Sequence, residues 1–203
     1  EQIQKGDTAL KNGVNISPGL IGYLVGLGVE KLDVISKPSI GIVITGNELT
    51  VLGNKLEDGK IYESNSYMLI AALKKYNYYT INLYRTLDEF EQTKNKIKSA
   101  IDENDVVLIS GGISVGEYDF VENSLINLKV KKHFYKVKQK PGKPLFYGSI
   151  KNKHVFGLPG NPGAALTCFY IYVLRLLSIL SGCKYPIETK KVYLNSNYNK
   201  KSG

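Results

Sequence analysis

The sequence predicts an α/β fold of three layers, in which helices cover both faces of a doubly wound, mostly parallel sheet. Apolar runs without polar alternation, such as residues 40–44, are typical of strands that are buried on both faces. These runs alternate with helical patterns along the chain, and such alternation is the signature of a parallel sheet. Three apolar runs end in corners rich in glycine or proline, so we expect loops of unusual backbone conformation at those strand ends.

The two ends of the chain do not follow this pattern. Residues 1–37 hold two glycine turns that flank an expected short strand, and Ser17-Pro18 then opens a helix expected over residues 19–28. We interpret this segment as the end of a preceding domain. Residues 187–203 contain a strand-like run at 191–194 and are expected to be the truncated start of a further domain.

The central α/β domain is expected over residues 38–186, and its helix starts follow from capping patterns. Ser64 or Asn65 caps one helix, and Asp88 begins another, with Glu91 three residues later as in a capping box. The expected strands are residues 40–44, 79–83, 106–109 and 134–138 and a hairpin over 145–156, and the expected helices are residues 64–76, 88–103 and 120–127 and a long helix from Pro162.

The formal net charge of +9 comes almost wholly from lysine, because Arg85 and Arg175 are the only arginines among the 203 residues. The lysines are dispersed, whereas nucleic-acid sites usually gather arginines or a basic stripe, so nucleic acid is not an expected partner. Two interpretations stay open. The lysines are solvated residues of a lysine-rich composition, or they steer an anionic small molecule toward a site.

The cysteines and the apolar segments indicate the cellular compartment and whether the chain spans a membrane. Cys168 and Cys183 lack the spacing of a zinc site or of a disulfide framework, which indicates a reducing compartment, and nothing resembles a secretory signal. We therefore expect a cytoplasmic protein. Residues 164–180 are apolar, but Arg175 interrupts them, so a buried core helix is favoured over a membrane span.

The first two corners, at residues 45–49 and 110–119, carry groups that suit an anion. In open α/β sheets ligands bind beyond the carboxyl ends of the strands, where these corners should meet. The Gly111-Gly112 pair leaves amide N–H groups uncovered for a phosphate or carboxylate, although such a pair can also be only a tight turn. Glu117 and Asp119 add carboxylates, which fit a nearby Mg²⁺; alternatively, Asp119 caps the next helix.

The third corner, at residues 157–162, begins the long helix. Asn161 can cap this helix and Pro162 fits its first turn, whereas Pro159 and Gly160 are not needed for helix initiation and would hold the helix end rigidly toward a ligand. Upstream lie four lysines. If they lie in a strand, three of them share one face, namely Lys136, Lys138 and Lys140, and Lys143 follows. That face is either a solvated edge or a row that faces phosphate.

Five segments in order resemble the family of MoeA-type molybdopterin molybdenumtransferases, to which a domain of gephyrin also belongs. They cover residues 38 to about 182, which would be the pterin-binding domain with a MogA/MoaB-like fold. The segments are residues 45–49 (TGNEL), 59–65 (GKIYESN), 111–119 (GGISVGEYD), 140–144 (KPGKP) and 157–162 (GLPGNP).

This resemblance implies an enzyme of molybdenum cofactor biosynthesis that binds molybdopterin or its adenylylated form. Such an enzyme inserts molybdate with release of AMP, requires Mg²⁺ and works as a homodimer of the full-length protein. Carried over by position, the acidic residues that manage the metal and activate the substrate are Glu48, Asp88 and Asp119. The residues implied to bind the pterin, phosphate and molybdate are Thr45, Ser64, Asn65, Gly111, Gly112, Ser114, Gly116, Lys136, Lys140, Lys143, Pro159, Gly160 and Pro162.

Two departures from the family pattern and three other functions stay open. Asn47 stands where an aspartate is usual, and Leu87 where an arginine is usual, so Asp88 is alternatively only a helix cap. The same fold would also suit a non-catalytic molybdopterin-binding or scaffold domain, or a molybdopterin adenylyltransferase. A nucleotide-binding domain is disfavoured because no G-x-G-x-x-G follows the first strand.

Overall fold

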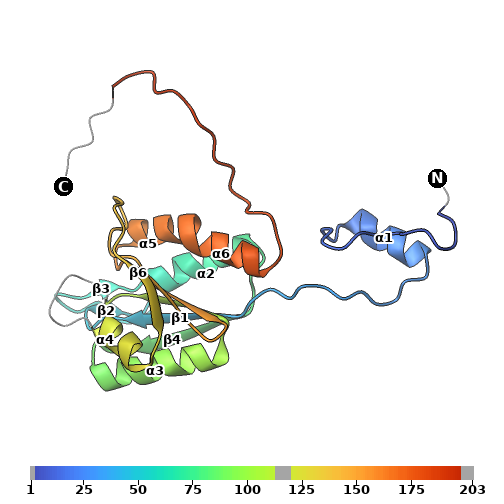
Figure 1. Cartoon of the computed structure of the whole chain (residues 1–203). Helices are drawn as coiled ribbons and strands as arrows, with labels where there is room; N and C mark the ends of the chain where they lie inside the picture. The colour runs from blue at the N-terminus through green and yellow to red at the C-terminus, as the bar shows by residue number, and fades with distance from the viewer. Residues whose placement is uncertain (1–2, 113–119, 198–203) are drawn as a thin grey trace.

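A six-stranded sheet forms the centre of the protein in the computed structural model, which describes residues 3–112 and 120–197 (Figure 1). The strand order is β4-β1-β5-β8-β7-β6. Strands β1, β4, β5 and β8 pair in parallel, and only the hairpin strand β7 runs against its neighbours. The bounds are β1 Ile40–Thr45, β4 Ile81–Thr86, β5 Val106–Ser110, β6 Lys131–Tyr135, β7 Phe146–Ile150 and β8 Lys153–Leu158.

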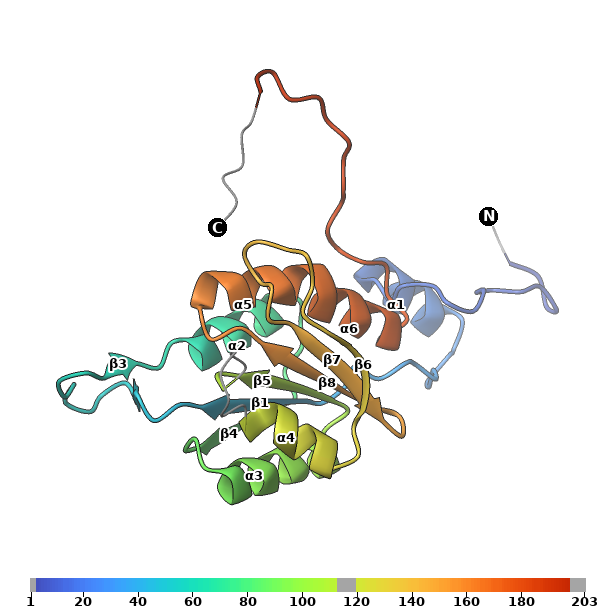
Figure 2. The same cartoon turned by 60° about the vertical axis from the view of Figure 1, so that its left-hand side comes forward.

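Helices cover both faces of this sheet, which confirms the expected three layers. One face carries α2 (Asn65–Lys75) and the long helix made of α5 (Pro162–Cys168), a π-helical turn (Phe169–Val173) and α6 (Leu174–Leu180). The other face carries α3 (Phe90–Glu103) and α4 (Phe120–Asn127), so the sheet lies between the two helical layers (Figure 2).

The uniform apolar character of the central strands follows from this layering. All six residues of β1 and all five of β5 are buried. Successive side chains of a strand point to opposite faces. Accordingly, Ile42 packs in the core under α2 and the long helix, whereas Val43 packs in the core under α3 and α4.

The long helix is a core helix, as its position after β8 predicts. Within the described residues, 162–180 is the one helix long and apolar enough to cross a membrane by length and composition. Phe169, Val173, Leu174 and Leu177 are fully buried against the sheet. Its start is also as expected, because the Asn161 side chain accepts a hydrogen bond from the Ala164 N–H at 3.1 Å.

Two strands and one helix begin or end away from the expected residues. The strand expected at 79–83 is β4, which begins later, at Ile81, and ends at Thr86. The start is delayed because Asn77, at φ 62°, turns the chain and Tyr78 packs into the core before the strand begins. The strand expected at 134–138 is β6, which ends before Lys136, at φ 65°. The helix expected from Asp88 starts at Phe90, with Glu89 at the N-cap position and no side-chain cap.

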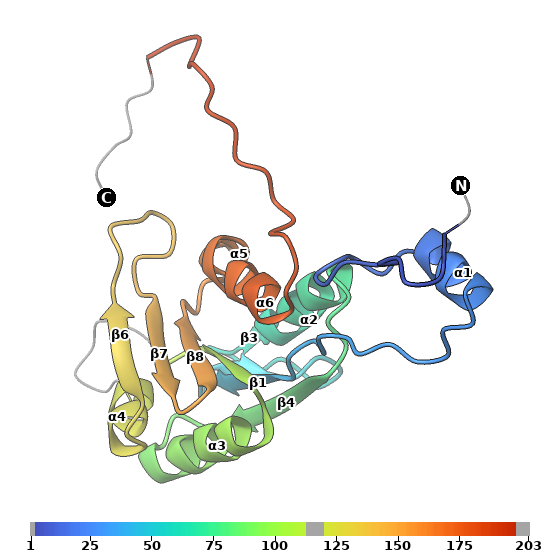
Figure 3. The ribbon, with the colours of Figure 1, turned by 45° about the vertical axis from the view of Figure 1, so that its right-hand side comes forward.

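The segments outside the sheet contain less regular structure than expected. Helix α1 (Pro18–Gly26) is capped by Ser17, whose hydroxyl accepts from the Leu20 N–H at 3.2 Å, and it lies away from the sheet (Figure 3). No strand forms between the two N-terminal turns or at residues 191–194. A short parallel pair, β2 (Leu49–Thr50) with β3 (Ile61–Tyr62), is additional to the elements expected.

Candidate functional site

The three corners leave the sheet at one edge. In the parallel register Ile44 lies beside Ser110, and Ser110 lies beside Leu158, so β1, β5 and β8 end at the same level. Thr45 ends β1 and leads into the first corner. The loop between β6 and β7 reaches this edge as well, because Phe146 pairs with Gly157 of β8. The sequence prediction that the corners share a strand-end edge is therefore confirmed.

The Gly111-Gly112 pair fits closely against the first corner. Both glycines have left-handed backbones, with φ of 96° and 64°. A Cβ on Gly111 would lie 1.9 Å from the Thr45 carbonyl oxygen, and one on Gly112 would lie 2.8 Å from Val121 and 3.8 Å from the Asp88 carboxylate. Any other residue would therefore push the two corners apart. This packing leaves a stretch of backbone without side chains, of the kind that approaches an anion.

Asp88 belongs to this edge and is not a helix cap. The buried Thr45 hydroxyl donates a hydrogen bond to the Asp88 carboxylate. The Asp88 N–H donates to the side-chain oxygen of Asn47 at 3.1 Å. Asn47 thus keeps the acceptor that an aspartate would supply there. The interpretation of Asp88 as the first residue of a capping box is wrong, because its carboxylate faces the first corner.

Asn65 joins the second and third corners. Its side-chain amide donates to the Ser110 hydroxyl and to the Gly160 carbonyl, both at 2.8 Å. Its carbonyl oxygen is buried and has no hydrogen-bond partner among the residues that the structure describes. Buried polar atoms are normally satisfied, so this oxygen is a candidate acceptor for a ligand or water. The assignment of Asn65 to the cradle thus has a structural counterpart, whereas Ser64 is exposed and makes no capping bond.

Glu63 is a buried acidic residue that sequence reasoning missed. It is 4% exposed, and its carboxylate accepts hydrogen bonds from the N–H of Ser66, at 2.8 Å, and from the Ser66 hydroxyl. It thereby satisfies the start of α2 in place of Ser64 or Asn65, the caps expected. The signal that could have revealed this role is the spacing of Glu63, which stands three positions before Ser66 in the first turn of α2.

The lysine group stands in the connection from β6 to β7, which we call the lysine loop (residues 136–145). Lys136, Lys140 and Lys143 are exposed, and the Lys136 ammonium lies 4.9 Å from the centre of the Tyr135 ring. The expected strand face shared by Lys136, Lys138 and Lys140 is wrong, because β6 ends at Tyr135. Alternation persists in the loop all the same, since Val137 and Gln139, between the lysines, are half-buried.

The third corner is rigid in the expected way. Pro159 is buried at the end of β8, the Gly160 carbonyl is held by Asn65, and Pro162 is the first residue of α5. Because the cap of α5 comes from Asn161, Pro159 and Gly160 are free to shape the approach to the helix.

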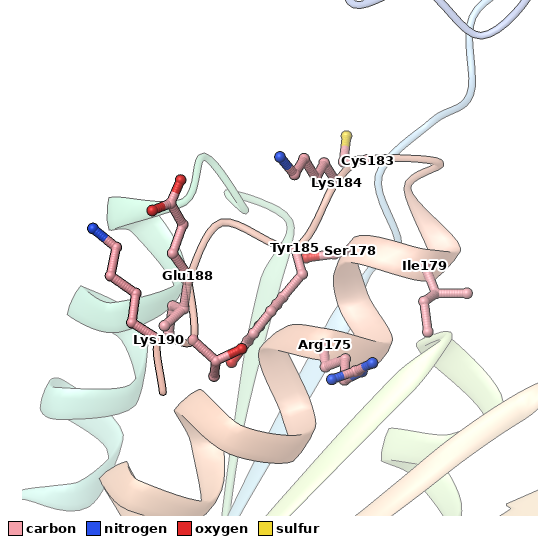
Figure 4. A pocket seen from close by; sticks show the side chains of 10 residues that line it. Arg175, Ser178, Ile179, Cys183, Lys184, Tyr185, Glu188 and Lys190 are labelled. Carbon is pink, nitrogen blue, oxygen red and sulfur yellow. The ribbon is translucent and has the colours of Figure 1, made fainter. Parts of the chain in front are cut away.

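One of two cavities lies beside the corners. One of about 270 Å³ adjoins the first corner and is lined by Ile44, Gly46, Leu49, Val51, Glu63, Arg85, Thr86, Leu87 and Gln92. A larger one, of about 600 Å³, lies at the far end of the long helix and contains none of the expected site residues (Figure 4). Its cations do not converge, since Arg175 and Lys184 point to different sides in Figure 4.

The remaining expected residues, Ser114, Gly116 and Asp119, lie outside the described residues, as do Glu117 and Tyr118. Within the described ranges no three His, Cys, Asp or Glu side chains gather as a metal site would require. Glu48 is exposed in the first corner, and its backbone carbonyl accepts from the Ile61 N–H at 2.9 Å.

Comparison with known proteins shows the family of the chain. Residues 41–178 match the family described as "Probable molybdopterin binding domain". The chain is 34% identical over 203 residues to a molybdopterin molybdenumtransferase of Staphylococcus epidermidis, covering 98% of this chain and 48% of that protein. The chain thus spans about half the length of the curated relatives it matches.

Solved structures give the same result. A molybdopterin biosynthesis MoeA protein of Pyrococcus horikoshii superposes with a TM-score of 0.73 at 33% identity, covering 85% of this chain and 43% of that chain. The molybdopterin biosynthesis Mog protein of Mycobacterium ulcerans shares the fold, with a TM-score of 0.53 at 14% identity, over 72% of this chain and 99% of that one. The resemblance drawn from the five segments is therefore confirmed.

Proposed function

We propose a function from one premise, that this chain belongs to the family of probable molybdopterin-binding domains. Its place is molybdenum cofactor biosynthesis. We propose that it binds molybdopterin or the adenylylated form at the shared edge of the three corners. We further propose that it helps to insert molybdate with Mg²⁺-dependent release of AMP, as a molybdopterin molybdenumtransferase.

The observation that carries this proposal is the bonding between the corners. Asn65 ties Ser110 of β5 to Gly160 before the long helix, and Gly111 lies against Thr45 of β1. One edge therefore presents uncovered amides, a buried oxygen of Asn65 that has no partner among the described residues and, from the lysine loop, positive charge. Amides and lysines suit the phosphate of molybdopterin and the molybdate oxyanion, which are both anionic substrates.

The described acidic residues fit part of a Mg²⁺ site. Mg²⁺ is usually held by one or two carboxylates together with substrate phosphates. Among the described residues, Thr45 alone bonds to the Asp88 carboxylate, so Asp88 retains acceptor capacity. We propose that Asp88, Glu48 and Asp119 hold the ion. When bound, Mg²⁺ would neutralise phosphate charge at the edge.

The protein's own part is positioning and electrostatics. Thr45 and Asn47 fix the Asp88 carboxylate from two directions, through its side chain and its backbone N–H. Lys140 and Lys143 supply positive charge that attracts the oxyanions, and the glycine pair lets the backbone approach them. Because pre-set donors need no reorganisation when charge develops, such groups lower the barrier without forming a covalent intermediate.

Replacement of Asp88 tests this proposal. We expect Asp88→Asn to weaken molybdopterin binding in the presence of Mg²⁺ by ~10-fold or more, because the carboxylate charge is lost while the shape is kept. The measurement is anaerobic titration calorimetry with and without Mg²⁺. Asp102→Asn is the matched control, since Asp102 is exposed near the end of α3. Equal affinities of wild type and Asp88→Asn, with Mg²⁺ present, would exclude Asp88 from the site.

We also propose that the protein is a homodimer, acts in the cytoplasm and has neither nucleic acid nor a membrane as partner. Support for the dimer comes from apolar side chains at the N-terminal segment: Val25, Val34 and Ile35 are each 65% or more exposed. Large exposed apolar side chains of this kind would be covered at an interface between two copies of the chain. Sedimentation of the chain at rising concentration should show a dimer that Val25→Asp weakens, and a monomer at every concentration would contradict this.

The two free cysteines support the proposed cytoplasmic location, because free thiols are typical of a reducing compartment.

A further inference from the structure

The lysine loop is anchored to the long helix by side chains that lie outside the corners. The Tyr172 hydroxyl donates to the side-chain oxygen of Gln139 at 2.8 Å. The Gln139 amide in turn donates to the Pro141 carbonyl at 2.7 Å, inside the loop, and lies 3.9 Å from the Cys168 sulfur. One loop residue, Gln139, thus connects the loop backbone to the long helix.

A second contact joins the loop to the helix. The buried Cys168 thiol donates to the Gly142 carbonyl at 3.7 Å. A Cβ on Gly142 would lie 2.6 Å from both the Cys168 sulfur and the Gln139 amide nitrogen, so this position admits only glycine. The loop therefore rests on the helix through Gln139 and Gly142, and the lysines between and beside them, Lys140 and Lys143, are exposed.

The helix is locally widened where it receives the loop. Tyr172 lies in the π-helical turn, and the N–H of Leu174 bonds to the carbonyl of Phe169, five residues back. Single π turns occur inside α-helices frequently at functional sites. Cys168 directly precedes this turn, and the Tyr172 ring also packs near Phe134, at 6.3 Å between centres. The turn therefore sets where the hydroxyl that holds Gln139 lies.

We propose that Tyr172 and Gln139 are positioning residues that hold Lys140 and Lys143 at the edge where the corners meet. This inference rests on the proposed function, in which the two lysines attract the anionic ligand. Without the anchor, the exposed loop would sample many positions, and ordering it would cost part of the binding free energy. The neck of the loop, where the Val137 N–H bonds to the Lys143 carbonyl at 2.9 Å, fixes its base but not its tip.

The test separates anchoring from ligand binding. Tyr172→Phe removes only the hydroxyl and keeps the ring, and Tyr170→Phe is the matched control, because the Tyr170 hydroxyl makes no hydrogen bond to a described residue and lies in the same turn. Amide hydrogen exchange needs no ligand. We expect exchange over residues 136–145 to be about fivefold faster in Tyr172→Phe, the factor that one hydrogen bond contributes, with strands β1 and β5 unchanged. Unchanged exchange in the loop would overturn the inference.

Affinity for molybdopterin is the second readout. We expect Tyr172→Phe to weaken binding about fivefold, from the same lost hydrogen bond. Gln139→Leu should weaken it as well, and Tyr172→Phe should then add no further loss in the Gln139→Leu background, because the two act as one unit. Faster exchange with unchanged affinity would make the anchor merely structural and overturn the inference.

A lysine variant separates this inference from the proposed function. If Lys140→Gln with Lys143→Gln weakens binding while Tyr172→Phe does not, the site stands and the positioning role is wrong. If the lysine pair can be replaced without any effect on affinity, the proposed role of the lysines is wrong, and the positioning role fails with it.

Discussion

Cys168 and Cys183 show how one residue type takes different chemistry from its surroundings. Burial of the Cys168 side chain raises the pKa of its thiol to about 11, although the Gln139 amide lowers it somewhat. A thiol with such a pKa is protonated at neutral pH, and this protonation lets it donate to the Gly142 carbonyl. Cys183 is exposed just beyond the long helix. Cys168 is therefore a packing and anchoring residue of the lysine loop.

The different surroundings of Cys168 and Cys183 predict that Cys183 is alkylated selectively. With iodoacetamide at pH 8, Cys183 should react readily in the folded protein, whereas Cys168 should react only after unfolding, because it lacks both access and thiolate character. Mass spectrometry of peptides after timed labelling measures both sites, and labelling in concentrated urea is the control that exposes them equally. Comparable labelling of the two thiols in the folded state would contradict the buried position of Cys168.

At the scale of elements, the sequence predicted best where a strand or helix is specified by its own pattern. The buried strand at 40–44 and the helix at 120–127 stand where expected, because their apolar patterns are local and extend over a few residues. Strand β6 was misplaced because the left-handed turn at Lys136 has no glycine or asparagine to mark it. Register against β7, a tertiary property, decides where that strand ends.

The candidate site shows the same division. Glycine and proline patterns predicted the corners, and their shared edge followed from the parallel sheet. The contacts that make the edge one structure were not predictable: Thr45 meets Asp88 across 43 positions, and Asn65 meets Gly160 across 95. Neither pair has a local signature. The same holds for Gln139 and Tyr172, 33 positions apart, which carry the anchoring of the lysine loop.

At the scale of the whole molecule, the amino-terminal edge of the sheet is also tied by polar side chains. The Asp105 carboxylate accepts from both the N–H and the hydroxyl of Ser39, at 2.8 and 2.7 Å, and this lowers its pKa. On the same edge the Tyr147 hydroxyl and the His154 ring nitrogen lie 3.0 Å apart. The ligand site proposed above lies at the carboxyl edge, while the opposite edge carries groups whose protonation affects stability.

His154 therefore predicts a pH dependence of unfolding. Burial, and secondarily the charge of His133, lower the His154 pKa below its ordinary value of 6.5. The neutral His154 ring is favoured in the folded state. Its contribution to the free energy of unfolding is therefore complete above pH 6.5 and is lost as the pH falls through the lower folded pKa. Asp105 acts in a separate pH window, because its depressed pKa makes its contribution to the free energy of unfolding complete above its ordinary value of 3.8.

We expect the free energy of unfolding, from urea titrations between pH 7.5 and 5, to fall less steeply in His154→Gln than in wild type. His133→Gln, an exposed neighbour, is the control and should remove only the smaller part of the slope. Equal slopes for wild type and His154→Gln would mean that other groups set the stability of this edge.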